Sequence, residues 1–390
     1  SSHGFRTDAW MCADTCLALG MSTLGCPSQP GVYLAGLRRD VPHVKGYAEP
    51  SEPLFPGSLD DFRAEHAGSS WLLSTLNNKV KVCRSCGKAC AFTLPACNAC
   101  GASLLEAGVS ATDNIFMGYV YGIARGAEGP LTITLRAQTP DALVLDDQMA
   151  ATVLHLNAIP TSVFIPDMRH LFADPTRALG LVRNLWEMSA KVALEQFWGD
   201  TAFRDKYFQG IPVPTSADGL LEFGMVGFNY PPSMYQLHLQ VIHLPLLPFH
   251  YAMALADGHF RKGRFYPLEY VLQALALGDA ARVPVSDETD MDEIVRRLDA
   301  LGVSYDDAYA AVKAKCFAAQ GRLAWSPEDF EYKVVDGKVL SLETDEEVEG
   351  KRPEELRAAD KRAISSYAKA PAVYYRFAKR PDEVPEFGVS

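Results

Sequence analysis

Polar and apolar side chains alternate along residues 233–243, which read SMYQLHLQVIH. Because the side chains of a β-strand point alternately to its two faces, Gln236, His238 and Gln240 would share one face. An imidazole and two amides are costly to bury unless they have hydrogen-bond partners. Imidazole is also a nucleophile near neutral pH. The pattern therefore predicts a functional site on one face of a strand.

A second candidate site is a cluster of cysteines. Cys83-x-x-Cys86 and Cys97-x-x-Cys100 form two pairs separated by ten residues, and a glycine follows each pair. Two residues between thiolates allow a tight knuckle, and four thiolates complete the tetrahedral shell of a structural Zn²⁺. We therefore predict a zinc ribbon with these four cysteines as ligands. Reduced thiols, or a redox pair in one Cys-x-x-Cys, are the alternative.

A second metal site at three of the other cysteines is the less favoured alternative. Cys90 lies between the knuckles and is interpreted as a bystander, while Cys12, Cys16 and Cys26 would need a fourth ligand that the sequence does not show. The odd total of nine and the paired spacing favour an intracellular, reducing compartment over a disulfide scaffold. The expected location is cytoplasmic, with an organelle as the alternative.

The polar strand resembles the histidine-triad signature, in which three histidines alternate with apolar residues. It is similar to the His-x-His-x-Gln variant of galactose-1-phosphate uridylyltransferase and of the dinucleotide and GDP-hexose phosphorylases. In that superfamily the middle histidine attacks the α-phosphate of a nucleotide and carries the nucleotidyl group as a phosphoramidate. The resemblance implies His238 as nucleophile and Gln240 as an amide that holds phosphoryl oxygens. Ser233 falls where the family places a phosphate-contacting serine.

The resemblance extends upstream and covers roughly residues 113–252. The family has an aspartate for the ribose hydroxyls, followed about eight residues later by a histidine that opens a strand ending in Val-Ile-Pro. Here Asp147 is followed by His155, and the strand ends at Ile159-Pro160. The resemblance implies that Asp147 binds the nucleotide and that His155 supports the strand. Asn229, on the strand before the triad, is implied as a further nucleotide contact.

The sequence departs from the family pattern in two places. Gln236 replaces the first histidine of the triad, so the hydrogen bond that holds the nucleophilic ring from that side must be rebuilt. We therefore include Gln236 among the candidate catalytic residues. The residues after Ile-Pro are Thr161, Ser162 and Val163 instead of the Lys or His often found there. An amide cannot act as an acid or a base, so Gln240 cannot activate a water molecule as a histidine does. The pattern therefore favours transfer to phosphate or a sugar phosphate over hydrolysis.

The charge balance restricts the partners. The chain has 37 Lys and Arg against 48 Asp and Glu, a net charge of −11, so general binding to nucleic-acid backbones or anionic lipid is not expected. A nucleotide site must therefore concentrate positive charge locally. The segment GHFRKGRF supplies Arg261, Lys262 and Arg264, which are predicted to clamp phosphate oxygens; a solvated basic turn is the alternative. His243, of opposite strand parity, and His250 are interpreted as structural.

The order of the expected helices and strands predicts an α+β fold. Its core would be an antiparallel sheet with a packed helix, like that of the histidine-triad (HIT) family. A zinc ribbon would precede this core, and a mostly helical extension would follow it. The expected domains are residues 1–75 as an irregular extension, 76–108 as the ribbon, 109–255 as the core and 256–390 as the extension. Short β-rich runs over 115–124, 131–138 and 142–147 indicate an antiparallel meander, continued by 152–160. Periodicity predicts a helix over 176–198, strands within 220–229 and 234–245, helices within 266–277, 291–302 and 304–319, and a hairpin after 330.

Three functions remain open on the sequence alone. The leading hypothesis is a nucleotidyltransferase or phosphorylase that acts on a nucleotide sugar or dinucleoside polyphosphate through a nucleotidyl-His238 intermediate. The second is a hydrolase of nucleotide adducts or capped nucleic-acid ends, with the ribbon gripping the strand. The third is a catalytically silent nucleotide-binding or assembly module. No segment has the length and apolarity of a membrane span. A homodimer is one assembly the resemblance allows.

Overall fold

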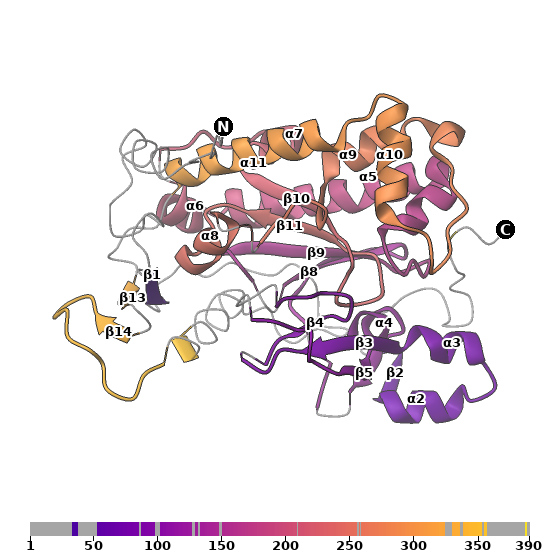
Figure 1. Cartoon of the computed structure of the whole chain (residues 1–390), viewed down its shortest axis with the longest axis horizontal. Coiled ribbons are helices and arrows are strands. Elements are labelled where there is room, and N and C mark those ends of the chain that lie inside the picture. Colours follow the sequence, from indigo (N-terminus) through magenta and orange to yellow (C-terminus); the bar gives the residue numbers. More distant parts are fainter. Residues whose placement is uncertain are drawn as a thin grey trace, which may run out of the picture.

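A six-stranded antiparallel sheet lies at the centre of the computed structural model (Figure 1). The structure describes residues 33–37, 53–85, 87–97, 102–126, 129–131, 133–147, 150–208, 210–255, 257, 259–323, 330–335, 338–352, 355–356 and 387. The strand order is β12-β10-β11-β9-β8-β7. The strands are β7 (Leu135–Gln138), β8 (Ala142–Asp146), β9 (Leu154–Pro160), β10 (Gly224–Asn229), β11 (Leu239–His243) and β12 (Phe265–Pro267).

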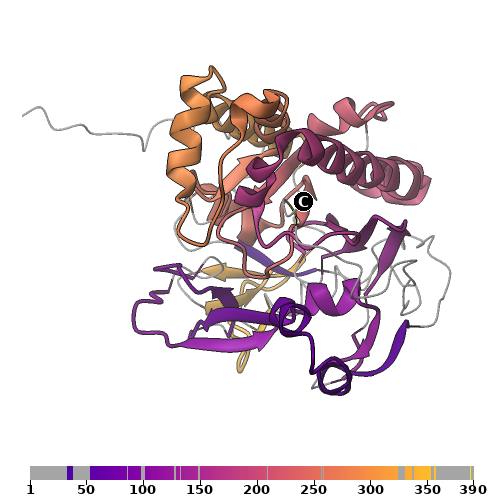
Figure 2. The same ribbon diagram turned by 90° about the vertical axis from the view of Figure 1, so that its right-hand side faces the viewer.

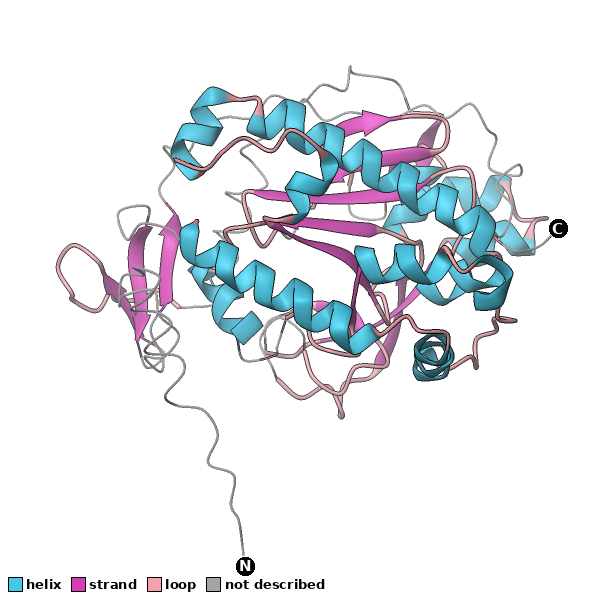
Figure 3. Ribbon diagram, turned by 90° about the horizontal axis from the view of Figure 1, so that it is seen from above, coloured by secondary structure: helices cyan, strands magenta, loops and turns pink. Residues whose placement is uncertain are grey.

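Helices cover one face of this sheet. The long helix α5 (Pro175–Val192) continues into a π-helical turn, η3 (Ala193–Trp198), as the periodicity predicts. Asp174 caps its first turn by accepting the backbone N–H of Arg177, and proline occupies the first helical position, where no intrahelical donor is needed. The apolar stripe of α5, including Val182 and Leu185, packs on Leu156 of β9 and its neighbours. Figure 3 shows the helices lying over the strands.

The other helices of this layer either precede β10 or follow β11 in the sequence. They are α6 (Thr201–Tyr207), α7 (Ala217–Leu221), α8 (Pro248–Leu255), α9 (Leu268–Leu275), α10 (Met291–Ala300) and α11 (Tyr305–Arg322), with 3-10 turns η2 (Met168–Ala173) and η4 (Gly278–Ala281). The helices predicted within 266–277, 291–302 and 304–319 are therefore confirmed. However, β12 pairs with β10, so the expected boundary at residue 255 falls inside the region that builds the central sheet.

The opposite face of the sheet packs against N-terminal elements, as Figure 2 shows from the side. These are β2 (Phe55–Ser58), α2 (Leu59–Glu65), α3 (Ser70–Thr75), α4 (Ile115–Val120) and β6 (Ile123–Arg125). Leu145 and Ile159 of the sheet share a core with Phe62 and Met117. Most of residues 55–75 is thus not irregular, contrary to expectation. Ser58 and Asp61 form a capping box that starts α2.

Residues 115–120 also differ from the expected meander, because they form α4. The Asn114 side chain accepts the backbone N–H of Met117 and caps this helix. A short apolar run has no periodicity that separates a buried strand from a buried helix, so the cap decides the outcome. The runs at 135–138, 142–146 and 154–160 are strands as predicted, which confirms the α+β class with antiparallel sheets.

A small three-stranded sheet occupies the position expected for the ribbon. Its order is β4-β3-β5, formed by β3 (Asn77–Val82), β4 (Ala89–Ala91) and β5 (Val109–Asp113). It lies beneath the central sheet in Figure 1. A third sheet joins β1 (Tyr33–Leu37) to the hairpin of β13 (Phe330–Val335) and β14 (Lys338–Ser341), and the hairpin is as predicted. No helix of the described residues is both long enough and apolar enough to cross a membrane.

Candidate active site

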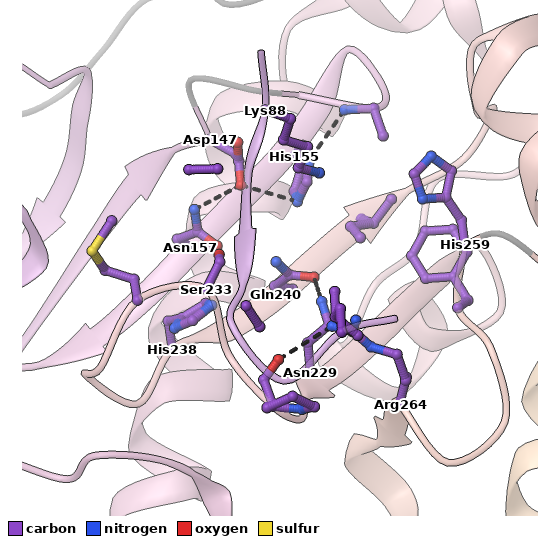
Figure 4. Close-up of a pocket in the computed structure, with 18 of the residues that line it drawn as sticks. Lys88, Asp147, His155, Asn157, Asn229, Ser233, His238, Gln240, His259 and Arg264 are labelled. Atoms are coloured by element: carbon purple, nitrogen blue, oxygen red, sulfur yellow. Dashed lines mark hydrogen bonds and ion pairs between the residues drawn. The ribbon is translucent and has the colours of Figure 1, made fainter. Parts of the chain in front are cut away.

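A pocket of about 460 Å³ lies between the central sheet and the small sheet, and it contains most of the predicted site residues (Figure 4). The sheet contributes His155 and Asn157 from β9, Gln240 from β11 and Asn229 from β10. Gln240 is directly paired with Asn157, so the two side chains lie on the same face. The opposite wall is formed by α4, by β4 of the small sheet with Lys88 before it, and by residues 94–97 of the loop that follows.

His238 lines the pocket immediately before β11 and is 8% exposed. Its Nδ1 lies 2.8 Å from the backbone carbonyl oxygen of Gln236, which can only accept a hydrogen bond. Nδ1 therefore carries the proton, and Nε2 has the lone pair. Burial lowers the pKa of His238 below its ordinary value, although the bond to Gln236 and the charge of Asp147 act in the other direction. The imidazole is consequently neutral at pH 7. Phe116 of α4 packs edge-on against the ring, with the centroids 5.0 Å apart.

Gln240 and Asn229 form an amide pair next to His238. Nδ2 of Asn229 donates to Oε1 of Gln240 over 2.5 Å. Because the oxygen of Gln240 is engaged, the amide group that it presents to the pocket is the NH₂ donor. Donors of this kind bind phosphoryl oxygens.

Asp147 follows β8 and is held by two residues of β9. Asn157 donates from Nδ2 to Oδ2 of Asp147 over 2.9 Å, and Nε2 of His155 lies 3.5 Å from the same oxygen. Nδ1 of His155 accepts the backbone N–H of Ala151, so its Nε2 carries the proton that faces the carboxylate. This arrangement agrees with the supporting role expected for His155. It orients the Asp147 carboxylate at the pocket, where it can accept hydrogen bonds from hydroxyl groups.

Gln236 does not line the pocket, in contrast to the shared face expected from strand alternation. β11 starts only at Leu239, and the Gln236 side chain is fully buried. Its Oε1 accepts the backbone N–H of Ile165, and its Nε2 donates to the carbonyls of Pro160 and Val163. The side chain thus ties the loop after β9 to the segment that carries His238. Its contact with His238 is made by the backbone carbonyl.

Ser233 is an exposed residue of the pocket rim in the loop between β10 and β11. The loop is attached to the N-terminal elements at two points: Asn78 of β3 donates to the carbonyl of Ser233, and Asn114 donates to that of Tyr235. The position of the loop that leads into His238 therefore depends on contacts with residues about 120 to 155 positions earlier in the chain.

The three basic residues of the predicted phosphate clamp separate in the structure. Arg264 and Arg261 line the pocket, whereas Lys262 does not. Lys262 points to α11, where its Nζ forms an ion pair with Asp306 at 2.8 Å. This side chain is therefore removed from the predicted clamp. Lys88, from the turn before β4, is a further cation of the pocket wall.

Arg264 is the more buried of the two arginines. Its Nη2 donates to the carbonyl of Pro231 over 3.2 Å, and its buried Nη1 has no hydrogen-bond partner within the described part of the chain. Burial lowers the pKa of Arg264 to about 10, so the guanidinium remains a cation at neutral pH.

Two histidines outside the triad differ in role. His243 is on the helix-covered face of β11, as its parity predicts, and accepts Trp198 Nε1–H at Nε2 while Nδ1 donates to the carbonyl of Leu244. Burial lowers the pKa of His243 to about 4. His250, which was also expected to be structural, lines the pocket and bonds through Nδ1 to Nε2 of His259 at 3.0 Å.

Cys83 and Cys97 are the two predicted zinc ligands that lie within the described residues. Cys83 and Cys97 are buried in one cluster with Cys90, whose Sγ is 3.6 Å from that of Cys97. Both knuckles have the same closing hydrogen bond, from Cys83 N to Lys88 O and from Cys97 N to Ala102 O. Gly87 has a φ of +72°, which a glycine adopts without strain. These features fit a tetrahedral thiolate site.

The remaining cysteine predictions cannot be placed. Cys12, Cys16, Cys26, Cys86 and Cys100 lie outside the described residues. Among the residues that are described, no group of three or more His, Cys, Asp or Glu side chains is arranged as a metal site.

The pocket residues that sequence reasoning did not predict include Lys88, Phe116, Asn157 and His259. Asn157 had a detectable signal, because it is two positions from His155 on the same strand and so shares its face. His259 is within the basic segment already noted. Lys88 and Phe116 reach the site only because the small sheet and α4 pack over it, and no local pattern reports such a contact.

Comparison with known proteins gives few matches. No family model and no curated protein matches this chain. Among solved structures, the aprataxin ortholog Hnt3 from Schizosaccharomyces pombe is 21% identical over 28% of this chain and 50% of its own, with a TM-score of 0.18. Two further Hnt3 structures, one in complex with DNA and guanosine, are 18% and 16% identical. They match 45% and 47% of this chain and 89% and 90% of theirs, both with a TM-score of 0.22.

The chain spans half the length of the first of these structures. Because all three TM-scores are below 0.5, the proposals that follow depend on the geometry of the site.

Proposed function

We propose that this chain is a nucleotidyltransferase or phosphorylase that acts on a nucleotide sugar or dinucleoside polyphosphate through a nucleotidyl-His238 intermediate. One observation carries the proposal: Nδ1 of His238 is bonded to the Gln236 carbonyl at 2.8 Å, in a ring that lines a 460 Å³ pocket. The neutral tautomer therefore has its lone pair on Nε2, the nitrogen available to attack a phosphorus atom.

The reaction would take place in two displacements at the same phosphorus. First, the Nε2 lone pair forms a P–N bond to the α-phosphorus, and the P–O bond to the leaving group breaks with its electron pair going to the leaving oxygen. An acceptor oxygen then attacks this phosphorus, and the P–N electron pair returns to Nε2. The bond from Nδ1 to Gln236 holds the ring in both steps, and it stabilises the positive charge that the ring develops.

The residues next to His238 suit transfer better than hydrolysis. Gln240 presents an NH₂ group, which can stabilise phosphoryl oxygens but cannot take a proton from water. An ionised phosphate group attacks through an oxyanion and needs no general base. Of the pocket imidazoles, His155 is engaged with Ala151 and Asp147, and His250 and His259 are bonded to each other. A phosphate or sugar-phosphate acceptor therefore matches the side chains present.

The nucleoside would bind with its ribose at Asp147. The carboxylate is oriented by Asn157 and His155, and it is the kind of acceptor that binds a pair of ribose hydroxyls. Ile115, Phe116 and residues 94–96 supply apolar surface on the opposite wall, against which a base can pack. We assign no specificity for a particular base, because apolar walls contain no hydrogen-bonding pattern that distinguishes one.

We further propose that Cys83, Cys86, Cys97 and Cys100 hold a structural Zn²⁺. The two described ligand positions support this by their burial and by the matching hydrogen bonds that close each knuckle. A zinc ion bound by four thiolates stabilises a small sheet but supplies no catalytic chemistry, because it has no open position. Residues 88–97 of this sheet line the pocket, so the metal would support the wall of the active site.

Intact-mass spectrometry after incubation with a panel of nucleotide sugars and dinucleoside polyphosphates tests the function. The wild-type chain should gain one nucleoside monophosphate in an acid-labile linkage. His238→Ala should gain none, and its turnover should fall at least about 1,000-fold. His238→Asn keeps a donor for the Gln236 carbonyl and controls for lost packing; it should unfold near the wild-type temperature and also form no adduct. Full turnover by His238→Ala would refute the proposal.

A further inference from the structure

The buried arginines differ in whether a carboxylate lies beside the guanidinium. Arg136 forms two hydrogen bonds to the carboxylate of Asp146, at 2.7 and 2.6 Å, and Arg169 forms two to that of Asp167, at 3.0 and 2.8 Å. Arg264 has no such carboxylate among the described residues. It has one bond to a carbonyl, and Nη1 is buried without a partner there. A buried guanidinium normally has an anion beside it.

The segment that carries Arg264 is held rigidly by α11. The hydroxyl of Tyr305 accepts the backbone N–H of Gly263 and donates to the carbonyl of Phe265. The hydroxyl of Tyr309 donates to the carbonyl of Phe260. The turn between Phe260 and Phe265 is therefore fixed before any ligand binds, and Arg264 is preorganised in the pocket wall.

Two imidazoles lie in the same part of the pocket wall. His250, on α8, and His259 are stacked with ring centroids 5.0 Å apart at 24°, and they share the hydrogen bond between Nδ1 and Nε2. In Figure 4, His259 and Arg264 lie on the side of Gln240 and Asn229 away from His238. Imidazoles bind phosphate oxygens through N–H and gain a proton readily when an anion is near.

We propose that Arg264, Arg261, His250 and His259 form a second anion subsite, which binds the phosphate group of the leaving group in the first displacement and, after that group departs, the acceptor phosphate in the second. This inference deepens the proposed function, on which it rests, by naming the residues that bind the phosphate or phosphomonoester acceptor. In the second step an oxygen of the bound phosphate forms the new P–O bond, and the P–N electron pair returns to Nε2 of His238. The same group leaves by the reverse path.

Binding of inorganic phosphate to the full chain, measured by calorimetry, tests the subsite without any covalent step. The wild type and His238→Ala should bind with similar affinity, and Arg264→Gln should bind at least tenfold more weakly. Lys262→Gln is the matched control, because it removes one positive charge from the same turn at a side chain outside the pocket; its affinity should stay within twofold. Equal binding by Arg264→Gln and the wild type would overturn the proposal.

The half-reactions then separate this subsite from the proposed function. A p-nitrophenyl ester of a nucleoside monophosphate has a leaving group that needs no phosphate subsite. Arg264→Gln should therefore slow the discharge of the His238 adduct to inorganic phosphate at least tenfold more than it slows formation of the adduct from this donor. If the wild type forms no adduct, the proposed function fails, while phosphate binding still decides the subsite. His259→Gln, which retains a partner for His250, gives a second variant if Arg264→Gln does not fold; it should weaken phosphate binding at least fivefold.

Discussion

Asn229 of β10 and Gln240 of β11 are joined by an amide hydrogen bond, with 2.5 Å between Nδ2 and Oε1. The bond determines which end of the Gln240 amide faces the pocket. In the histidine-triad pattern this position often holds a histidine. Each of its ring nitrogens can either donate or accept a hydrogen bond, depending on the tautomer. Here the Gln240 side chain presents its NH₂ group to the pocket, and the hydrogen bond from Asn229 on the neighbouring strand holds it in that orientation.

Asn229→Asp should therefore reverse the Gln240 amide. A carboxylate can only accept, so Gln240 must turn its NH₂ towards position 229 and its oxygen towards the phosphoryl group. We expect the rate of adduct formation to fall about 100-fold, the scale for losing one oxyanion donor. Asn229→Ala leaves the amide free to choose either orientation and should lose only about tenfold. A rate for Asn229→Asp equal to or above that of Asn229→Ala would contradict this role.

Asp147 should discriminate ribonucleotides from dideoxynucleotides. Asn157 and His155 hold its carboxylate at the pocket, where it would accept the ribose hydroxyls. For Asp147→Asn we expect KM for a ribonucleotide donor to rise about 10-fold to 100-fold, the value of a charge-assisted hydrogen bond. KM for the 2′,3′-dideoxy donor should be the same in both proteins. A parallel rise for both donors would place the carboxylate away from the ribose.

Adduct formation should be insensitive to pH around neutrality and should fall only in acid. Burial lowers the pKa of His238 below its ordinary value of 6.5, so the nucleophile is neutral above that lowered pKa and is lost by protonation below it. The rate of adduct formation against pH should have an acid limb with a midpoint below 6.5. Stopped-flow measurement with the p-nitrophenyl donor gives this profile directly. A midpoint above 6.5 would show that the charge of Asp147 outweighs burial.

His243 should make folding stability depend on pH. Its folded pKa of about 4 is below the ordinary value of 6.5, so unfolding takes up a proton between these limits. The free energy of unfolding therefore falls as the pH drops from 6.5 towards 4, by about 2 kcal/mol at pH 5. In His243→Gln, the amide can replace the hydrogen bonds to Trp198 and to the Leu244 carbonyl, but it does not titrate. Urea unfolding at pH 7 and pH 5 should show the wild type losing about 2 kcal/mol more than the variant; equal losses would refute this.

The opposite outcomes for His243 and Gln236 show how far strand parity predicts a site. His243, His238 and Gln240 lie in or beside β11, and alternation assigned each to its observed face. Gln236 lies three residues before the strand, where the chain no longer alternates, and three backbone groups of the 160–165 loop satisfy its amide. These partners are more than 70 positions away in sequence, so no local pattern could reveal them.

The basic turn shows a second limit. Composition identified Arg261, Lys262 and Arg264 together, but only tertiary packing separates them. Tyr305 and Asp306, adjacent on α11, respectively fix the Gly263 backbone and pair with Lys262, which leaves Arg264 to the pocket. Likewise, the cysteine spacing predicted a ribbon, but it did not reveal that residues within 88–97 line the pocket that contains His238.

Removing metal should weaken substrate binding without affecting the nucleophile. Elemental analysis of the purified chain should find one zinc per molecule, and Cys83→Ser and Cys97→Ser should each lose it. Because residues 88–97 form the pocket wall, these variants should raise KM for the nucleotide donor at least about tenfold. Cys90→Ala, which removes a buried thiol between the knuckles, is the matched control and should retain the metal. Loss of zinc from Cys90→Ala would contradict the proposed ligand set, and the 3.6 Å between the sulfurs of Cys90 and Cys97 would then place Cys90 in the metal shell.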